Sequence, residues 1–268
     1  MRFEASANFG NKMSTVIHIN ERERSYAFHA SVRKIVLLGI SLPMFGMFFG
    51  ILWSIFFDME RTTATHCLVK NYLPSISAAF NYFPTSSVWR ICISLHLFTK
   101  IVLFYLTTMN RSKKMNQLSL LAPYQGSLSK FATTMNGIEN FSLLCLTMIT
   151  SKENKTIHVI SFTFFVISSI SYIVSIYLLY SSMVLETQLE RKSLRLKKRY
   201  CTINILSFLL VVYSYYRHNA YCEPGVYTMF AFFEYIFVLS NIGFHYTESL
   251  DFHSYSCIVG EDRKISSS

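Results

Sequence analysis

Charged residues are scarce in this chain of 268 residues. They make up 15% of it, whereas soluble domains average roughly 25%. Hydrophobic residues account for 51% of the chain and aromatic residues for 16%. The sequence has no internal repeat, and its long apolar runs leave no room for a separate soluble domain. The scarcity of charge therefore argues against an ordinary soluble globular protein and predicts a single membrane-embedded domain.

Six long apolar runs, separated by polar loops, dominate the sequence. The first run has 23 residues without a charge, which at 1.5 Å per residue is enough to cross a hydrocarbon core of about 30 Å. It starts too late and is too long for the apolar part of a cleaved signal, so we expect it to stay as a span. The predicted spans are 35–57, 88–109, 128–150, 158–180, 201–217 and 226–246, of which the fifth is the shortest. The predicted fold is all-α, a polytopic membrane bundle of six transmembrane helices.

The net charge of +10 comes from basic residues that gather in alternate loops. Eighteen of the 25 Lys and Arg residues flank one face of the predicted bundle and five flank the other. Because positive charge marks the cytosolic face, we expect cytosolic tails at 1–34 and 248–268 and a lumenal loop at 58–87. The basic run 191–199 is expected to anchor the chain at anionic headgroups. This distribution accounts for the charge, so nucleic acid is not an expected partner.

Small residues recur every four positions in the first span. Gly46 and Gly50 form a GxxxG step, and Ser54 continues it at the same spacing. Small side chains in this pattern let a neighbouring helix approach closely. We expect the stripe to pack helices within one chain rather than to join two chains.

Ionisable and amide residues inside the predicted spans form a first candidate site. A charge at the bilayer centre costs at least about 2.5–3.5 kcal/mol, so each such residue is expected to have a structural or functional role. Helical spacing places His96 with Lys100 on one helix face, and Glu234 with Asn241 and His245 on another. The third span carries Asn136, Glu139 and Asn140. Because Lys100, Glu139 and Glu234 lie at similar depth in their predicted spans, we expect Lys100 to lie between the two glutamates. Two interpretations remain open: an ion-paired network that fixes the bundle, or a polar cavity that binds a lipid headgroup or passes protons.

The predicted lumenal loops hold a second candidate site. His218 and Glu223 have the H-x4-acid spacing of the His–carboxylate dyad in many lipid acyltransferases, although the usual acid is Asp and the spacing also arises by chance. In an acyltransferase, His218 would take a proton from a hydroxyl, and Glu223 would orient the His218 ring. Arg217 would contact phosphate, with Asn219 beside it. His66 is the alternative base.

Two cysteines, Cys67 and Cys222, fall in the predicted lumenal loops. An oxidising lumen permits a disulfide between them, and two free thiols are the alternative. The histidines and acids of the same loops match no metal-ligand spacing. We expect no metal and no cofactor.

Several strings of residues, in the same order, resemble the post-GPI-attachment-to-proteins factor 2 family. The strings are Ile51–Ser54, Thr62–Cys67, Asn71–Ser75, Val88–Arg90, Leu95–His96, Ile138–Asn140, Thr156–His158, Arg217–Thr228, Glu234–Tyr235 and Asn241–His245. The likeness runs from about residue 33 to 252. It implies a multi-pass membrane protein of the Golgi apparatus or endoplasmic reticulum in the FRAG/DRAM/Sfk group.

The resemblance also implies a role in the lipid remodelling of GPI anchors. In the family, a lyso-anchor is reacylated with a saturated fatty acid on the lumenal side. The chain is then either the acyltransferase itself or a non-enzymatic scaffold that presents lipid to a separate transferase. The implied partners are membrane lipid, GPI-anchored proteins and remodelling enzymes. A phosphoinositol headgroup or an acyl donor is expected at the polar groups of the spans, namely His96, Lys100, Glu139, Asn140, Glu234, Asn241 and His245.

Overall fold

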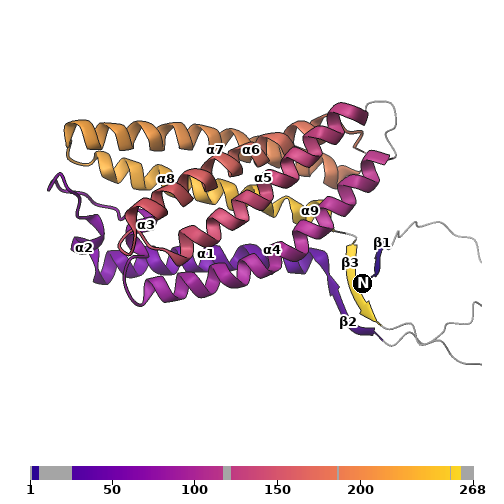
Figure 1. Cartoon of the computed structure of the whole chain (residues 1–268), viewed down its shortest axis with the longest axis horizontal. Helices are drawn as coiled ribbons and strands as arrows, with labels where there is room; N and C mark the ends of the chain where they lie inside the picture. Colours follow the sequence, from indigo (N-terminus) through magenta and orange to yellow (C-terminus); the bar gives the residue numbers. More distant parts are fainter. Residues whose placement is uncertain (1, 6–25, 117–121, 186, 254, 261–268) are drawn as a thin grey trace, which may run out of the picture.

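The computed structural model describes residues 2–5, 26–116, 122–185, 187–253 and 255–260. Six long helices run side by side along one axis (Figure 1). They are α1 (Val32–Phe57), α4 (Thr85–Asn116), α5 (Ala122–Met148), α6 (Lys155–Ser181), α7 (Gln188–Tyr221) and α8 (Val226–Tyr246). The structure therefore confirms the predicted helical bundle.

The two ends of the bundle differ, and we name them by their main features. The disulfide end carries α2 (Met59–Thr63), α3 (Ile76–Ala79) and the turns that join α5 to α6 and α7 to α8. The sheet end carries α9 (Glu248–Asp251) and three strands (Figure 1). By the positive-inside prediction, the disulfide end is the one expected to face the lumen.

Four of the long helices are long and apolar enough to cross a membrane. They are α1, α4, α6 and α8 together with its continuation through α9. The remaining two, α5 and α7, carry more polar residues along their length. The described part of the chain thus supports a membrane protein with these four candidate spanning helices, whereas the other two predicted spans do not meet the same criterion.

Helix α7 extends far beyond the apolar run 201–217 that predicted it. It begins at Gln188, where Thr187 and Glu190 form a capping box, and it ends at Cys222 in a left-handed conformation. Its first turns contain strong helix formers such as Leu, Glu, Lys and Arg, so the helix continues where the apolar pattern stops. In contrast, α8 coincides with the predicted span 226–246.

A small antiparallel sheet joins the two terminal segments, which departs from the all-α prediction. Strand β3 (Tyr255–Gly260) lies between β1 (Arg2–Ala5) and β2 (Tyr26–Ser31). Strand β2 leads directly into α1, and β3 follows α9 closely. The predicted tails 1–34 and 248–268 therefore contain paired strands. Their partners are more than 200 residues apart in sequence, and local sequence patterns do not show such pairings.

The stripe of small residues in α1 packs against other helices of the same chain, as predicted. A Cβ on Gly46 would press against Trp89 and Cys92 of α4. A Cβ on Gly50 would overlap the ring of Phe80, directly after α3. Without side chains at these two positions, α1 lies close to both elements, which helps to form one wall of the central cavity described below.

Candidate functional site

A disulfide between Cys67 and Cys222 ties the 64–75 loop to the end of α7. Their Cα atoms are 5.2 Å apart, and 155 residues separate them in the sequence. The bridge brings His66 against His218, with ring centroids 5.6 Å apart in an edge-on arrangement. The structure thus forms the disulfide and brings together the two histidines that the sequence proposed as alternative bases.

His218 is buried and has unused hydrogen-bonding capacity. Its side chain is 2% exposed, and neither ring nitrogen has a hydrogen-bond partner among the described residues. Its ring also packs 5.1 Å from the ring of Tyr227. His218 lies one residue beyond the predicted span 201–217. Burial has the larger effect in lowering the pKa of its imidazole, and the neighbouring His66 lowers this pKa further. A neutral ring with a free nitrogen can accept a proton from a hydroxyl.

The predicted pairing of His218 with Glu223 does not form. Glu223 is held by Arg217, whose Nε donates to it at 3.2 Å while a second guanidinium nitrogen contacts its other oxygen. Arg217 also donates to the hydroxyl of Tyr213 at 3.3 Å. The side chain of Asn219 is exposed and donates to a carbonyl of its own helix. A positive charge six residues earlier in sequence competes for the carboxylate more strongly than a neutral imidazole does.

The disulfide also bears on metal binding. Ligand atoms of His66, Cys67 and Cys222 lie within 4.8 Å of one another. The sulfurs of Cys67 and Cys222 are bonded to each other, so neither is available as the thiolate that coordinates a zinc ion. The trio, as the structure has it, does not fit a structural zinc site.

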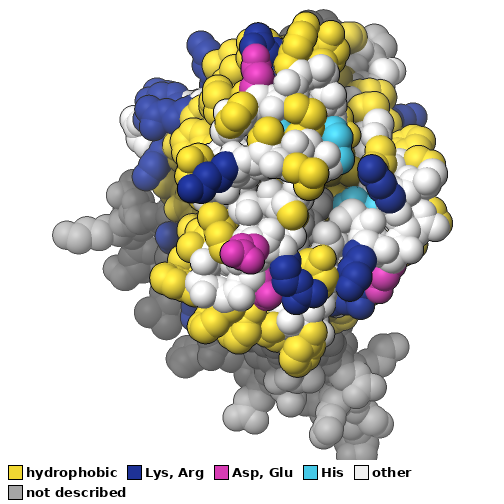
Figure 2. All heavy atoms as spheres, turned by 90° about the vertical axis from the view of Figure 1, so that its left-hand side faces the viewer, with side chains coloured by type: hydrophobic (Ala, Val, Ile, Leu, Met, Phe, Trp, Pro, Cys, Tyr) yellow, Lys and Arg dark blue, Asp and Glu magenta, His cyan; other side chains and the backbone are white. Residues whose placement is uncertain are grey.

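Basic side chains surround the disulfide end (Figure 2). Arg61 and Lys152 both lie over the ring of Tyr82, at 4.1 and 4.6 Å from its centroid. Histidine side chains reach the surface between the charged residues in the same view. This end therefore combines positive charge with imidazole groups, which is a suitable surface for a phosphate-bearing headgroup.

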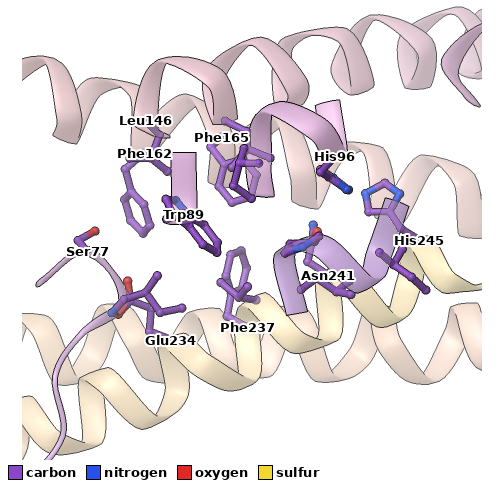
Figure 3. Close-up of a pocket in the computed structure, with 17 residues that line it drawn as sticks. Ser77, Trp89, His96, Leu146, Phe162, Phe165, Glu234, Phe237, Asn241 and His245 are labelled. Atoms are coloured by element: carbon purple, nitrogen blue, oxygen red, sulfur yellow. The ribbon is translucent and has the colours of Figure 1, made fainter. Parts of the chain in front are cut away.

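A cavity of about 80 Å³ lies inside the bundle (Figure 3). Aromatic and aliphatic side chains form most of its wall, among them Trp89, Phe165 and Phe237. Polar groups stand at its two ends: Ser77 with Glu234, and His96 with Asn241 and His245. A second cavity, of about 50 Å³, adjoins the first and shares part of its wall.

Beyond the far end of the first cavity, five buried residues form a charge cluster: Lys100, Glu139, Asn241, His245 and Glu248. The Lys100 ammonium lies 2.7 Å from His245 Nδ1 and 3.8 Å from the Glu248 carboxylate. Glu139 accepts from Asn241 at 3.0 Å and lies 3.5 Å from His245 Nε2. All five side chains are buried. Opposite charges in contact offset much of the cost of burial, which fits the interpretation of an ion-paired network.

The prediction that Lys100 lies between Glu139 and Glu234 is wrong for Glu234. Glu234 lies at the other end of the cavity, where its Oε2 accepts from the backbone N–H of Ile76 at 2.8 Å. The second acid of the cluster is Glu248, which the sequence reading assigned to the C-terminal tail. Asn140 stays outside the cluster and donates to Asn136 of its own helix. His96 faces the cavity, and its Nδ1 lies 2.6 Å from the carbonyl of Gly39.

Sequence reasoning missed Glu248 because it lies beyond the last apolar run. The helix α8 ends at Tyr246, and α9 continues it with Glu248, Ser249 and Leu250 buried in the bundle. The signal was the spacing: His245 and Glu248 are three residues apart, and their side chains meet at 3.2 Å. An acid three residues after a buried histidine marks a candidate partner even where hydropathy has ended.

These features define a class: a polytopic helical membrane protein that encloses an apolar cavity, with a histidine-bearing, disulfide-linked end. A model of the Frag1/DRAM/Sfk1/Cwh43P N-terminal domain family matches residues 32–255. The chain therefore belongs to this family. Relatives at 39–42% identity place it, within the family, in the post-GPI attachment to proteins factor 2 group.

Curated relatives carry the same group name. The chain is 39% identical over 244 residues to Post-GPI attachment to proteins factor 2 of Drosophila melanogaster, covering 88% of this chain and 91% of the relative. It is 39% identical over 228 residues to a protein of Xenopus tropicalis named Acyltransferase PGAP2, covering 80% and 84%. A Caenorhabditis briggsae relative, also named Post-GPI attachment to proteins factor 2, is 42% identical over 220 residues, covering 79% and 82%. No solved structure matches the chain.

Proposed function

We propose that this protein reacylates lyso-GPI-anchored proteins, adding a saturated fatty acid during their maturation in the secretory pathway. The observation that carries the proposal is the apolar cavity that opens toward polar groups at the disulfide end. The lining of this cavity suits the first part of a fatty-acid chain next to its carboxyl group, because mostly apolar walls with a few polar groups bind amphiphiles and fix their orientation. The names of the relatives, which include an acyltransferase, support the same reaction.

The proposal places all six long helices across a Golgi or endoplasmic-reticulum membrane. Helix α5 has 27 residues and α7 has 34, so each is long enough to span the bilayer. Their polar side chains then face the bundle interior or the membrane surface. Both termini and the sheet end lie in the cytosol, and the disulfide end lies in the lumen, where a disulfide is stable. The substrate anchor occupies the lumenal leaflet and so reaches the histidines directly.

We assign the acceptor half of the site to the disulfide end. His218, whose ring nitrogens have no hydrogen-bond partner among the described residues, accepts the proton of the lyso-anchor hydroxyl, and His66 is the alternative acceptor beside it. Arg217 binds a phosphate oxygen, for which it exchanges part of its contact with Glu223. Asn219 is exposed on the same helix, and we assign it to the residues that contact the lipid headgroup. Glu223 is not assigned the orienting role, because its contacts are to Arg217.

Within the bundle, the proposal divides the expected lipid-binding residues into two groups. Glu234, His96, Asn241 and His245 line the cavity and contact bound lipid. Lys100 and Glu139 lie behind them and hold Asn241 and His245 in place. Asn140 has no contact that supports a part in the site.

Histidine substitutions in cells that lack the protein test the catalytic assignment. His218→Ala is expected to lower the yield of saturated anchor lipid by 10²-fold or more, the usual effect of losing a general base. His66→Ala should have a smaller effect, and the exposed His253→Ala at the sheet end is the matched control. Mass spectrometry of the anchor lipids is the readout. Full rescue by His218→Ala and by His66→Ala would remove both residues from the catalytic assignment.

A non-enzymatic scaffold is the second candidate function. It is favoured by one observation: among the described residues, no carboxylate contacts His218 to orient it as a base, because Glu223 is bound to Arg217. Such a protein would present the lyso-anchor to a separate transferase. Purified protein in defined lipid separates the two functions. Turnover without any other protein supports the enzyme, and binding of the lyso-lipid without turnover supports the scaffold.

A further inference from the structure

A serine and a histidine face each other at the junction of the two cavities. Ser77 belongs to α3 and His158 to the first turn of α6, and the Ser77 Oγ lies 3.0 Å from His158 Nε2. The His158 side chain is 7% exposed. No sequence motif pointed to Ser77, because 81 residues separate it from its partner.

The hydrogen bonds fix which nitrogen of His158 carries the proton. Its Nδ1 lies 2.7 Å from the carbonyl oxygen of Ile149. A carbonyl only accepts, so Nδ1 carries the hydrogen, and Nε2 of the neutral ring presents a lone pair. Ser77 then donates to Nε2. This is the arrangement in which an imidazole takes the proton of a serine nucleophile, with a backbone carbonyl in place of the usual orienting carboxylate.

Three contacts from α8 position the segment that precedes Ser77. The Glu234 carboxylate accepts from the N–H of Ile76, and the hydroxyl of Tyr227 donates to Ser75 Oγ at 2.9 Å. The hydroxyl of Tyr235 donates to the carbonyl of Pro74. The serine is therefore held on a short helix whose start is fixed from one side, while His158 approaches from the other.

Ser77 also borders the space that a fatty-acid chain would fill. It lines the cavity of about 80 Å³ (Figure 3). It also lines the adjoining cavity of about 50 Å³, as does His158. Ile76, Trp89, Leu143 and Leu146 form the wall that the two cavities share. A chain lying along these walls places its carboxyl end beside the serine. A hydrogen bond that served only to join α3 to α6 would need no cavity on the serine side.

We propose that Ser77 is a nucleophile that carries the fatty acid as an ester before its transfer, with His158 as its base. The inference rests on the proposed function and adds the donor half of the reaction to it. The donor is a long-chain acyl ester or thioester, and two sources supply this chemistry: a membrane phospholipid and an acyl-coenzyme A.

The proposed steps balance without any further reactant. Ser77 Oγ attacks the donor carbonyl while His158 Nε2 takes its proton. The bond from the carbonyl carbon to the leaving oxygen or sulfur breaks, and His158 returns the proton to that leaving group. In the second step, the hydroxyl of the lyso-anchor attacks the Ser77 ester. Its proton, accepted first by His218, passes to His158 Nε2, which is neutral again after the first step, and from there to the Ser77 oxygen, which leaves as the free hydroxyl.

Covalent labelling of the purified full-length protein tests the proposal. The protein is incubated without acceptor, in one arm with a phosphatidylcholine bearing an alkyne-tagged stearoyl chain and in the other with alkyne-tagged stearoyl-coenzyme A. We expect the tag on the peptide that contains Ser77 in one arm, which identifies the donor. Addition of lyso-phosphatidylinositol should discharge it. Ser77→Ala should abolish the label, and His158→Gln should slow its formation by 10²-fold or more.

Two further variants separate chemistry from folding. Ser87→Ala removes an exposed serine of α4 and should label normally. Ser77→Cys keeps a nucleophile, so its label should form as a thioester that neutral hydroxylamine releases. Absence of label from the wild-type protein in both arms overturns the proposal. So does restoration of saturated anchor lipids in cells by Ser77→Ala to the wild-type level.

The outcomes distinguish this proposal from the proposed function. If the wild-type protein and Ser77→Ala both restore saturated anchor lipids in cells, the covalent step falls and the remodelling function stands. If the wild-type protein restores none, the remodelling function falls. In that case, the presence or absence of the label on Ser77 alone shows whether the covalent step occurs.

Discussion

The ammonium nitrogen of Lys197 lies 2.6 Å from the carboxylate of Asp251, inside the bundle. Their side chains are 2% and 5% exposed. Ser193 completes the group, since its hydroxyl accepts from Lys197 and donates to Asp251, both at 2.7 Å. Lys197 belongs to the basic run 191–199, which the sequence analysis assigned as a whole to the membrane surface. The other five basic residues of this run are exposed, whereas the helical turn of α7 directs Lys197 inward.

Removal of the Lys197 charge should destabilise the protein strongly. Lys197→Met leaves the Asp251 carboxylate buried with the Ser193 hydroxyl but without its cationic partner, which typically costs about 3–5 kcal/mol. At this chain length the loss corresponds to a fall of roughly 10 °C in melting temperature. Thermal unfolding of the purified protein in detergent measures it. The neighbouring Lys198→Met removes an exposed charge and should stay within about 0.5 kcal/mol of wild type. Equal melting temperatures for the two variants would show that the pair is not buried.

Loss of the disulfide should loosen the histidine pair as well as lower stability. Cys67→Ser frees the 64–75 loop from α7, and removal of a native disulfide typically costs 2–5 kcal/mol. His66 then loses its fixed position beside His218, so remodelling of anchor lipids should fall in parallel. Peptide mapping without reduction shows the bridge in the wild-type protein. Cys145→Ser, which removes a free cysteine, is the control. A wild-type protein that maps with free thiols at 67 and 222 would contradict the expectation.

The sequence predicted the helices well because apolar runs of this length have few alternatives in a membrane. It also predicted that polar residues within the spans face inward, since the cost of exposing them to lipid is large. It could not predict which of them meet. Lys100 has several acids at similar depth, and the choice of Glu248 over Glu234 depends on how α8 and α9 turn and pack. That choice is made by tertiary structure, and its local trace is the three-residue spacing of His245 and Glu248.

The Ser77–His158 pair shows the same limit at the disulfide end. His158 was noted in the sequence as the start of a span, but its partner lies on a four-residue helix in a long loop. Serine is common in such loops, and nothing in its immediate neighbours distinguishes Ser77. Conversely, the His218–Glu223 spacing looked like a dyad, although Arg217, one residue farther away in the sequence, is the residue that binds Glu223. Spacing along one helix and the following turn does not decide between two neighbours for the same carboxylate.

Glu153 should contribute to stability in a pH-dependent way. Its carboxylate accepts from Arg90 at 2.8 and 2.9 Å and from the backbone N–H of Thr150 at 2.8 Å. The Arg90 guanidinium, followed by this N–H, lowers the pKa of Glu153 from 4.5 to about 2. The folded state therefore binds its proton less readily than the unfolded state. The contribution is complete above about pH 5.5 and disappears as the pH falls through 4.5 toward 2.

Comparison with Glu153→Gln measures this contribution. The pair is largely exposed, so the difference in unfolding free energy should be only about 0.2–1 kcal/mol at pH 7. Melting temperatures in detergent between pH 7 and pH 3 should converge for the two proteins at the acidic end. Glu60→Gln, at an exposed acid of the same end, should show no such convergence. A constant difference across this pH range would mean that the ion pair does not form.

A side chain at Gly50 should disturb the cavity wall through a chain of ring contacts. A Cβ at this position overlaps the Phe80 ring, which is stacked on Trp89 with centroids 4.3 Å apart. Trp89 in turn lines both cavities. Gly50→Ala is therefore expected to cost about 1–3 kcal/mol through overpacking and to narrow the space available to a fatty-acid chain.

The matched control is Gly137→Ala, because a Cβ at Gly137 of α5 meets no atom within 4 Å. Replacing glycine by alanine inside a helix favours the helix by about 1 kcal/mol, so this variant should be at least as stable as wild type. Thermal unfolding and anchor-lipid analysis should then separate the two glycines. Gly50→Ala should lose both stability and saturated anchor lipid, whereas Gly137→Ala should keep both. If Gly50→Ala retains full activity despite reduced stability, the wall formed by Phe80 and Trp89 does not limit the acyl chain, and the bound lipid must lie elsewhere.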